Sequence, residues 1–260
     1  MSMPFFTPAT DPGTNFPELL KRMGLTAEPT GDGGELSVPH ATTCVAIRFA
    51  DGVLMAGDRR ATSGNLISHR AMEKVVPADR FSAVAIAGAA GPAMEMVKLF
   101  QLQLEHYEKV EGSPLSLEGK ANTLSAMIRG NLPAAMQGMV VVPIFAGWDG
   151  RRHTGRLFAF DVTGGRYEET DYVATGSGSL HAGTVVKIGY KSDLTRDQVI
   201  NLCLKALWEA ADADSATGGP DPLRGIYPTV ATVTADGYVA VSDLELKTRF
   251  EAIAPEVPAK

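Results

Sequence analysis

The chain has 260 residues, of which 45% are apolar and 21% charged, and its 24 basic and 30 acidic side chains give a formal net charge of −6. This composition excludes a wholly disordered chain, and the acidic balance argues against a nucleic-acid binder, because attraction to phosphates requires a basic face. There is no run of about 18 apolar residues to span a membrane, and residues 1–16 lack the basic and apolar regions of a secretion signal. Two cysteines are too few for a disulfide framework. We therefore expect a cytoplasmic protein.

Residues 1–41 differ in composition from the rest of the chain. They are rich in Pro, Gly, Thr and Asp, and only residues 16–25 could form a short helix, which Gly24 would end. We expect 1–41 to be a leader or flexible arm, for which an ordinary disordered terminus is the alternative, and 42–260 to form one domain.

Strand-like sequence begins at Thr43. Runs at 43–49 and 53–58 flank Asp51-Gly52, which is typical of a hairpin turn. Further strands are expected at 81–87, which Gly88 ends, at 139–148, which Pro143 interrupts, and at 172–175. Two more hairpins are expected, one from 156–162 and 165–169 and one from 229–234 and 238–241.

Helices are expected in two pairs between these strands. The first pair is 93–110, after Pro92, and 116–131; the second is 180–190 and 195–211, where Thr195 and Gln198 form a capping box. Paired helices disfavour alternating βαβ units. The order favours an α+β fold, a four-layer α/β/β/α sandwich of two antiparallel sheets.

Metal and cofactor chemistry find little support. The five histidines are widely separated, and there is no His-x-x-x-His, Cys-x-x-Cys or phosphate-binding glycine loop. Asp212, Asp214 and Asp221 fit a solvated acidic helix end better than a cation site. Cys44, in a strand, and Cys203, on an apolar helix face, fit packing. We expect no metal and no cofactor.

Thr42 stands where the composition changes. A threonine hydroxyl is a poor nucleophile without a base, but a chain beginning with Thr carries one in its own α-amino group, whose pKa is about 7.7–8.0. Removal of 1–41 would therefore create a catalytic residue at Thr42. Asp58 ends the opposing strand, Lys74 is a cation between apolar neighbours, and Gly88 offers a backbone N–H. Taken singly, Asp58 and Lys74 are more often surface or ion-pair residues, and a Thr-Thr pair is more often ordinary strand sequence.

Several uncommon strings occur in order across 42–260. They are Thr42-Thr43, Met55-Ala56-Gly57-Asp58-Arg59-Arg60-Ala61-Thr62, Ile86-Ala87-Gly88, Leu104-Glu105-His106-Tyr107-Glu108-Lys109, Gly176-Ser177-Gly178-Ser179 and 214–221. On these strings the chain resembles the catalytic β-type subunits of the actinobacterial proteasome core particle, which are N-terminal nucleophile hydrolases with a four-layer sandwich.

The resemblance implies a threonine endopeptidase. Thr42 would be the nucleophile, exposed by autocatalytic cleavage after Ala41. Asp58 and Lys74 would be the supporting carboxylate and lysine, and Gly88 the oxyanion donor. The residues that would orient the α-amino group are Ser177, Asp214 and Thr217. Asp212 and Ser215 have the same spacing as the last two, and Asp214 is preferred because Gly218-Gly219 then follows the hydroxyl.

The resemblance also implies how substrate is held. Main-chain bonds would come from Thr62, Gly88 and Ala90. The specificity pocket would be formed by Ala61, Met72, Val76, Ile86, Ala90 and Met94. All six are apolar, so cleavage is expected after large apolar residues. Implied partners are proteasome α subunits and copies of this chain in stacked heptameric rings, a ring ATPase that acts through the α ring, and unfolded or tagged proteins.

One residue departs from the family's pattern. Relatives carry Gly immediately before the nucleophile, whereas this chain has Ala41, and Gly permits backbone angles that a Cβ resists. The alternative is therefore a non-catalytic or unprocessed ring subunit. An amide hydrolase of the same superfamily acting on a small molecule is disfavoured by the strings after Gly176.

Overall fold

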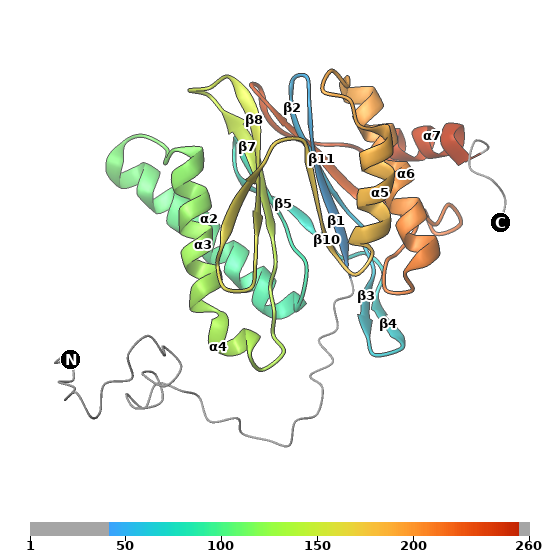
Figure 1. Ribbon diagram of the computed structural model, residues 1–260, viewed down its shortest axis with the longest axis horizontal. Coiled ribbons are helices and arrows are strands. Elements are labelled where there is room, and N and C mark those ends of the chain that lie inside the picture. The colour runs from blue at the N-terminus through green and yellow to red at the C-terminus, as the bar shows by residue number, and fades with distance from the viewer. Residues whose placement is uncertain (1–41, 255–260) are drawn as a thin grey trace, which may run out of the picture. The chain divides into compact units, whose positions relative to one another are not determined.

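A computed structural model describes residues 42–254 of the chain (Figure 1). The short helix expected at 16–25 lies outside the described residues. Among the helices that are described, none is long and apolar enough to cross a membrane.

The first sheet is built on the predicted N-terminal hairpin. Its antiparallel order is β10 (Tyr172–Gly176), β1 (Thr43–Phe49), β2 (Gly52–Gly57), β11 (Thr229–Thr234) and β12 (Gly237–Ala240). All of β2 and nearly all of β1 are buried, because they occupy the middle of a sheet that is covered on both faces.

The second sheet is also antiparallel throughout. Its order is β5 (Val75–Asp79), β6 (Ser82–Ala85), β7 (Ile144–Asp149), β8 (Thr154–Phe160) and β9 (Arg166–Glu169). The strand expected at 139–148 was placed too early, since β7 starts only after Pro143, which has no N–H to give to a ladder. Val141, before this proline, makes only an isolated bridge to Gly88.

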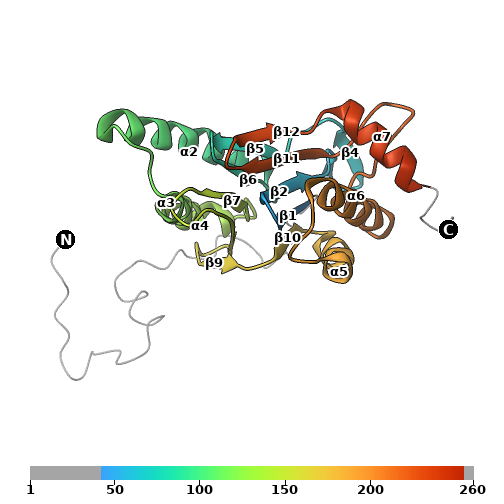
Figure 2. The ribbon, with the colours of Figure 1, turned by 90° about the horizontal axis from the view of Figure 1, so that it is seen from above.

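Helices cover the outer face of each sheet, as Figures 1 and 2 show. The bounds are α2 (Ala90–Glu111), α3 (Leu117–Gly130), α4 (Leu132–Ala135), α5 (Ser179–Gly189), α6 (Arg196–Ala213) and α7 (Asp243–Ile253). One apolar cluster joins α2 and α3 to the second sheet, another joins α5, α6 and α7 to the first sheet, and a third fills the space between the sheets. The predicted four-layer α+β sandwich is confirmed.

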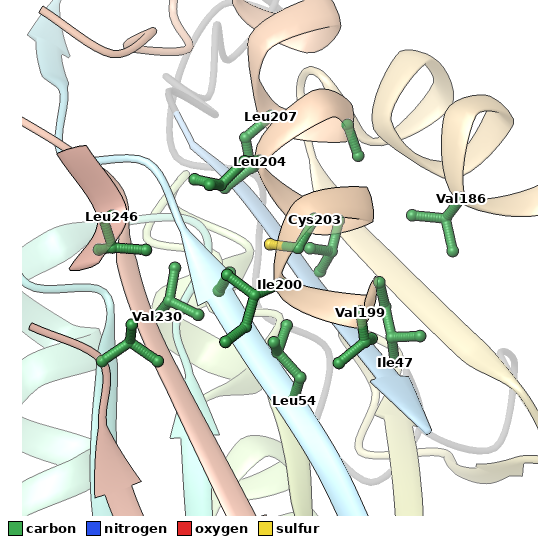
Figure 3. Packing of buried hydrophobic residues seen from close by; sticks show 14 of the residues in the cluster. Ile47, Leu54, Val186, Val199, Ile200, Cys203, Leu204, Leu207, Val230 and Leu246 are labelled. Atoms are coloured by element: carbon green, nitrogen blue, oxygen red, sulfur yellow. The ribbon is translucent and has the colours of Figure 1, made fainter. Parts of the chain in front are cut away.

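The packing of α6 shows why the predicted helix forms where it does. Its capping box is present, with the Thr195 side chain accepting from Gln198 N–H and the Gln198 side chain accepting from Thr195 N–H. Figure 3 shows one face of α6, with Ile200 and Leu204, directed at the β1 and β2 side chains. Full burial of each such residue contributes about 1.5–3 kcal/mol.

The sequence patterns missed five elements: β3 (Ala61–Ser63), β4 (Leu66–His69), β5, α4 and α7. The β3–β4 hairpin is short and largely exposed, so it lacks alternating burial. Helix α7 is mostly polar, but its buried residues Leu246, Phe250 and Ile253 follow helical spacing, and Ser242 caps it by accepting from Glu245 N–H. Helix α7 could therefore have been predicted from its spacing and its cap.

Candidate active site

Thr42 lies at the start of β1, where a turn from another part of the chain holds it. Its carbonyl accepts the backbone N–H of Ser177 at 2.9 Å, and only 4% of the residue is exposed. The turn must pass close to make this contact: a Cβ on Gly176 would lie 1.8 Å from the Thr42 carbonyl oxygen, and Gly176 has φ +97°. Because residue 176 is glycine, the 176–178 turn can approach closely enough to hydrogen-bond the Thr42 carbonyl.

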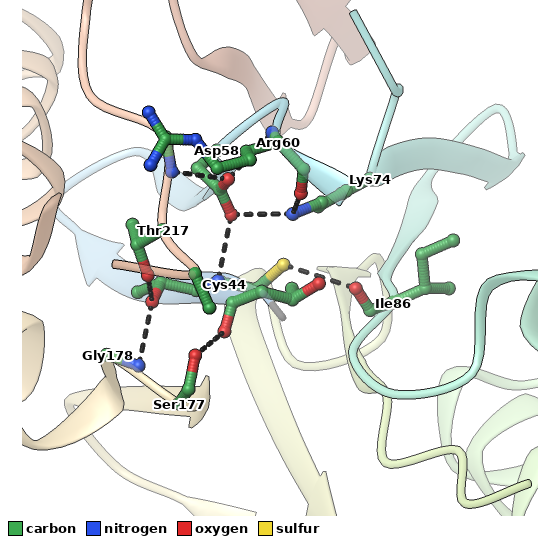
Figure 4. Close-up of polar contacts among 12 residues, drawn as sticks. Cys44, Asp58, Arg60, Lys74, Ile86, Ser177, Gly178 and Thr217 are labelled. Atoms are coloured by element: carbon green, nitrogen blue, oxygen red, sulfur yellow. Dashed lines mark hydrogen bonds and ion pairs between the residues drawn. The ribbon is translucent and has the colours of Figure 1, made fainter. Parts of the chain in front are cut away.

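Asp58 and Lys74 form a buried ion pair beside the start of β1 (Figure 4). The Lys74 Nζ lies 2.7 Å from Asp58 Oδ1 and donates to the Arg60 carbonyl at 2.6 Å, and the two residues are 1% and 0% exposed. Asp58 also accepts three backbone N–H groups, from Thr43, Arg60 and Gly218, at 2.8–2.9 Å. A buried ion pair survives when both charges are hydrogen-bonded in this way.

Ser177, Asp214 and Thr217 are joined by their side chains. Asp214 Oδ2 accepts the hydroxyls of Ser177 at 2.5 Å and Thr217 at 2.6 Å. Burial raises the pKa of Asp214, but these hydrogen bonds and one from the Ala216 N–H outweigh it and hold the pKa below its ordinary value. Ser215, the alternative hydroxyl residue, presents its carbonyl to the Arg60 guanidinium at 2.8 Å. The contacts therefore link the preferred pair, Asp214 and Thr217.

Thr43 connects this network to β1, a contact the sequence patterns missed. Its hydroxyl accepts the N–H of Gly178 at 3.0 Å and lies 2.6 Å from the Thr217 hydroxyl. Since Thr217 donates to Asp214, Thr43 donates to Thr217, and three donors follow one another towards a single carboxylate. A Cβ on Gly178 would lie 2.3 Å from the Thr43 hydroxyl oxygen, so the Gly-Ser-Gly-Ser string was the available sign of this close approach.

The backbone N–H of Gly88 points away from the neighbouring segment, residues 140–142. Ala89 N–H donates to the Val140 carbonyl, and Val142 N–H donates to the Ala87 carbonyl. Gly88 and Val141 are thus a non-hydrogen-bonded antiparallel pair, in which each residue's own N–H points outward. With φ +111°, and a Cβ position 2.1 Å from the Val140 carbonyl oxygen, residue 88 has to be glycine.

Thr42, Lys74 and Gly88 line one small pocket of about 90 Å³. Five residues expected to contact substrate line it too: Ala61, Thr62, Met72, Ile86 and Ala90. The structure adds Ala87, Ala89 and Ala93. The other two expected residues, Val76 and Met94, do not line this pocket and pack, partly buried, against the apolar cluster of α2 and the second sheet.

Cys44 lies under this pocket and Cys203 in the α6 core, and both are buried free thiols, as expected. The Cys44 Sγ donates to the Ile86 carbonyl at 3.4 Å, and burial raises its pKa to about 12. Within 42–254, no group of three or more His, Cys, Asp or Glu side chains is placed to hold a metal ion.

The arrangement brings together a hydroxyl, a cation held by a carboxylate, and an outward backbone N–H. Two antiparallel sheets between helix layers, with a threonine at the start of the first strand facing the pocket, have the architecture of the N-terminal nucleophile hydrolases. Ala41, and with it the expected cleavage site and the 1–41 leader, lies outside the described residues.

Comparisons with known proteins agree with this class. A family model described as "Proteasome subunit" matches residues 38–221. The chain is 56% identical over 259 residues to a proteasome subunit beta of Acidimicrobium ferrooxidans, covering 99% of this chain and 93% of that protein. It is 59% identical over 212 residues to one of Streptomyces griseus, covering 82% and 75%, and 50% identical over 248 residues to one of Jonesia denitrificans, covering 94% and 82%. The chain belongs to the proteasome subunit family, as a β-type member, and the predicted resemblance is confirmed.

Proposed function

We propose that this chain is a threonine endopeptidase, the catalytic β subunit of a proteasome core particle. The observation that carries the proposal is the pocket shared by Thr42, Lys74 and Gly88, with Asp58 holding the lysine. The nucleophile becomes active when residues 1–41 are removed and Thr42 gains a free α-amino group.

In the proposed reaction the Thr42 hydroxyl oxygen attacks a peptide carbonyl while its proton passes to the α-amino group. Lys74, charged and held by Asp58, favours that deprotonation. The Gly88 N–H donates to the oxyanion of the tetrahedral intermediate, a contribution of about 2.7–4 kcal/mol where such donors have been removed. The first product leaves as an amine, and water then hydrolyses the ester. Ser177, Asp214 and Thr217 orient the α-amino group.

Substrate preference follows from the pocket lining. Apart from Thr42, Thr62 and Lys74 the lining residues are apolar or glycine, so we expect cleavage after large apolar residues. Fluorogenic peptides with Leu, Phe, Tyr, Arg or Glu before the scissile bond measure this preference. A dominant preference for Arg overturns it. Val76 and Met94 remain predicted pocket residues that could contact a longer side chain.

The proposed setting is a cytoplasmic particle. The chain assembles with copies of itself and with α subunits in stacked heptameric rings, and a ring ATPase feeds unfolded or tagged proteins through the α ring. The relatives named above are proteasome β subunits, which supports this setting.

The test of activation is the intact mass and N-terminal sequence of subunits from assembled, active particles. Loss of residues 1–41 and a sequence starting at Thr42 support the proposal. Ala41 is the one residue that favours the alternative, an unprocessed structural ring subunit, since its Cβ resists the backbone angles that self-cleavage requires. Active particles whose chains retain 1–41 would falsify the nucleophile assignment. Ala41→Gly should speed the appearance of the processed chain.

A further inference from the structure

A second, larger pocket lies at the other end of the second sheet. Its volume is about 660 Å³, a size typical of ligand sites. It is bordered by the β7–β8 turn, the segment leading into α3 and the β5–β6 turn. Strand β7 starts opposite Ala85, near Gly88, and ends at Asp149, so this pocket and the Thr42 pocket lie at opposite ends of β7.

The floor of this pocket is apolar. Phe81, Leu115, Leu117 and Trp148 all line it, and Leu117 is 5% exposed. An apolar side chain entering here would replace water over aromatic and aliphatic surface, which favours binding.

Charged groups at the edge of the floor, three of them buried, neutralise one another. The Arg156 guanidinium donates to Asp149 at 2.9 Å and to Glu168 at 2.6 Å, and Lys120 lies 2.5 Å from Asp79. Burial raises the pKa of Asp149, but hydrogen bonds from Arg156 and from backbone N–H groups outweigh it, so the carboxylate stays charged. These five charged groups are committed to internal pairs and leave little attraction for a ligand.

The rim, by contrast, carries two arginines, of which, among the described residues, one has a distant ion-pair partner and the other has none. Arg151 and Arg152 are exposed residues of the β7–β8 turn, and their backbone N–H groups donate to Asp149 at 3.0 and 3.2 Å, which fixes the turn. Within 42–254 the Arg151 guanidinium has no hydrogen-bond or ion-pair partner, and the Arg152 Nε reaches Asp149 only at 4.0 Å.

The same turn holds an unusual backbone. His153 has φ +50°, the only positive φ of a non-glycine residue in the part of the chain that the structure describes. Such a conformation costs free energy and persists where surrounding contacts enforce it, often at binding sites. These contacts therefore fix the backbone from which the two arginines project beside the pocket.

We propose that this pocket binds an acidic peptide segment of a partner protein, with an aromatic or aliphatic side chain on the apolar floor and neighbouring carboxylates paired with Arg151 and Arg152. The chain has a net charge of −6, so a rim with two exposed arginines is a local exception that would steer an acidic partner to this face. The two arginines are consecutive and exposed at the rim, an arrangement suited to a peptide crossing the opening. This proposal is independent of the peptidase proposal.

Trp148 provides a direct test, because the chain has only two tryptophans and the other, Trp208, packs in the α6–α7 core. In a full-length Trp208→Phe chain that also carries Thr42→Ala, to prevent cleavage of the probe, Trp148 fluorescence is titrated with acetyl-Glu-Glu-Phe-Glu-Glu-amide. We expect a saturable change that acetyl-Lys-Lys-Phe-Lys-Lys-amide does not cause. Arg152→Glu should weaken binding by about fivefold or more, from loss and reversal of one exposed charge pair.

The matched control is Lys98→Glu, the same change in charge at an exposed residue of α2 outside the pocket, and it should leave the affinity unchanged. Calorimetric titration of the chain with both tryptophans repeats the measurement without Trp208→Phe. The proposal is overturned if the acidic peptide fails to bind in both measurements, or if Arg152→Glu and Lys98→Glu weaken binding equally. Phenylacetate binding as tightly as the peptide overturns the assignment of a peptide as occupant.

Discussion

The chain buries two lysine–aspartate pairs, at opposite ends of one strand. Lys74, just before β5, lies 2.7 Å from Asp58, and Lys120 lies 2.5 Å from Asp79, the last residue of β5. Both lysines are at most 5% exposed. Each aspartate also accepts further hydrogen bonds: Asp58 from three backbone N–H groups, and Asp79 from the Phe81 N–H and the Ser82 hydroxyl.

What differs is the neighbourhood of each lysine. Lys74 shares its pocket with the Thr42 hydroxyl and the Gly88 N–H. Lys120 borders the larger pocket, where the nearby hydroxyl residue, Ser116, is used to cap α3 by accepting the Gly119 N–H. Both lysines are therefore buried and paired with a carboxylate, and the adjacent nucleophile and oxyanion donor make one of the two places a candidate active site.

The largest expected effect separates the two lysines. Lys74→Met removes the charge proposed to favour deprotonation of the Thr42 hydroxyl and should lower kcat of assembled particles by about 10²–10⁴. Lys120→Met removes an equally buried charge and should leave kcat of the folded protein unchanged. Fluorogenic peptide hydrolysis measures both.

Stability is the control for this pair of variants. Lys74→Met strands a fully buried Asp58 and should cost about 3–5 kcal/mol, and Lys120→Met should cost less because Asp79 keeps contact with water. Urea unfolding measures this, and Lys74→Arg provides a charged variant if Lys74→Met fails to fold. Equal loss of kcat in folded Lys74→Met and Lys120→Met chains would contradict the comparison.

The next largest effect is expected from replacing Gly88, with Gly112 as the matched control. Gly88→Ala pushes a Cβ against the Val140 carbonyl and displaces the proposed oxyanion donor, so kcat should fall by about 10²–10³. Gly112, the residue after α2, also has a positive φ of +69°, but nothing lies within 4 Å of its Cβ position. Gly112→Ala should therefore cost only about 1 kcal/mol of stability and no activity. Similar kcat values for the two variants would show that residue 88 plays no special part.

The Asp214 network gives a smaller, pH-dependent effect. The pKa of Asp214 is lowered in the folded chain, so its contribution to stability is present above the unfolded value, about 3.9, and is lost as pH falls through the folded value. Thr217→Val removes a donor to the ionised carboxylate and should raise this pKa, whereas Thr217→Ser should keep it low. Carboxyl NMR titration measures the shift, and an unchanged pKa in Thr217→Val would show that the Thr217 hydroxyl is not an effective donor.

The smallest effect concerns thiol chemistry. Because burial raises the pKa of Cys44 to about 12 and also raises that of Cys203, iodoacetamide at pH 8 should modify neither thiol in the folded chain and both in urea. Intact mass after timed exposure measures this. Rapid modification of Cys44 alone would mean that the pocket end of the sandwich opens while the α6 core stays closed.

Much of the fold was predictable because strand and helix periodicities are local. The N-terminal hairpin and α6 follow directly from an Asp-Gly turn and a capping box. The β3–β4 hairpin was not predicted, since it is short and exposed and depends on no core face. The start of β7 was predicted too early because the apolar residues around Pro143 look like one continuous strand. The proline has no N–H to donate to a neighbouring strand, so β7 begins after it.

The candidate site was predictable mainly through family resemblance. Without the resemblance, Asp58 and Lys74 remained ordinary surface or ion-pair residues, because an ion pair is formed by the fold and not by nearness in sequence. Thr43 was missed since a hydroxyl in an apolar strand resembles ordinary packing. Asp214 was preferred over Asp212 because Gly218-Gly219 then follows Thr217, whereas the contact of Asp214 with Ser177 spans 37 residues of chain and is made by the fold.

The anchoring of β1 has a consequence for a chain that begins at Thr42. First residues of proteins usually fray, because little holds them. Here the Thr42 carbonyl is tied to the Ser177 N–H and the next N–H to Asp58, and both contacts lie downstream of the bond that maturation would break. After cleavage, Thr42 would thus be the first residue but would stay as ordered as an interior one. Catalysis would then need no ordering step after the leader is removed.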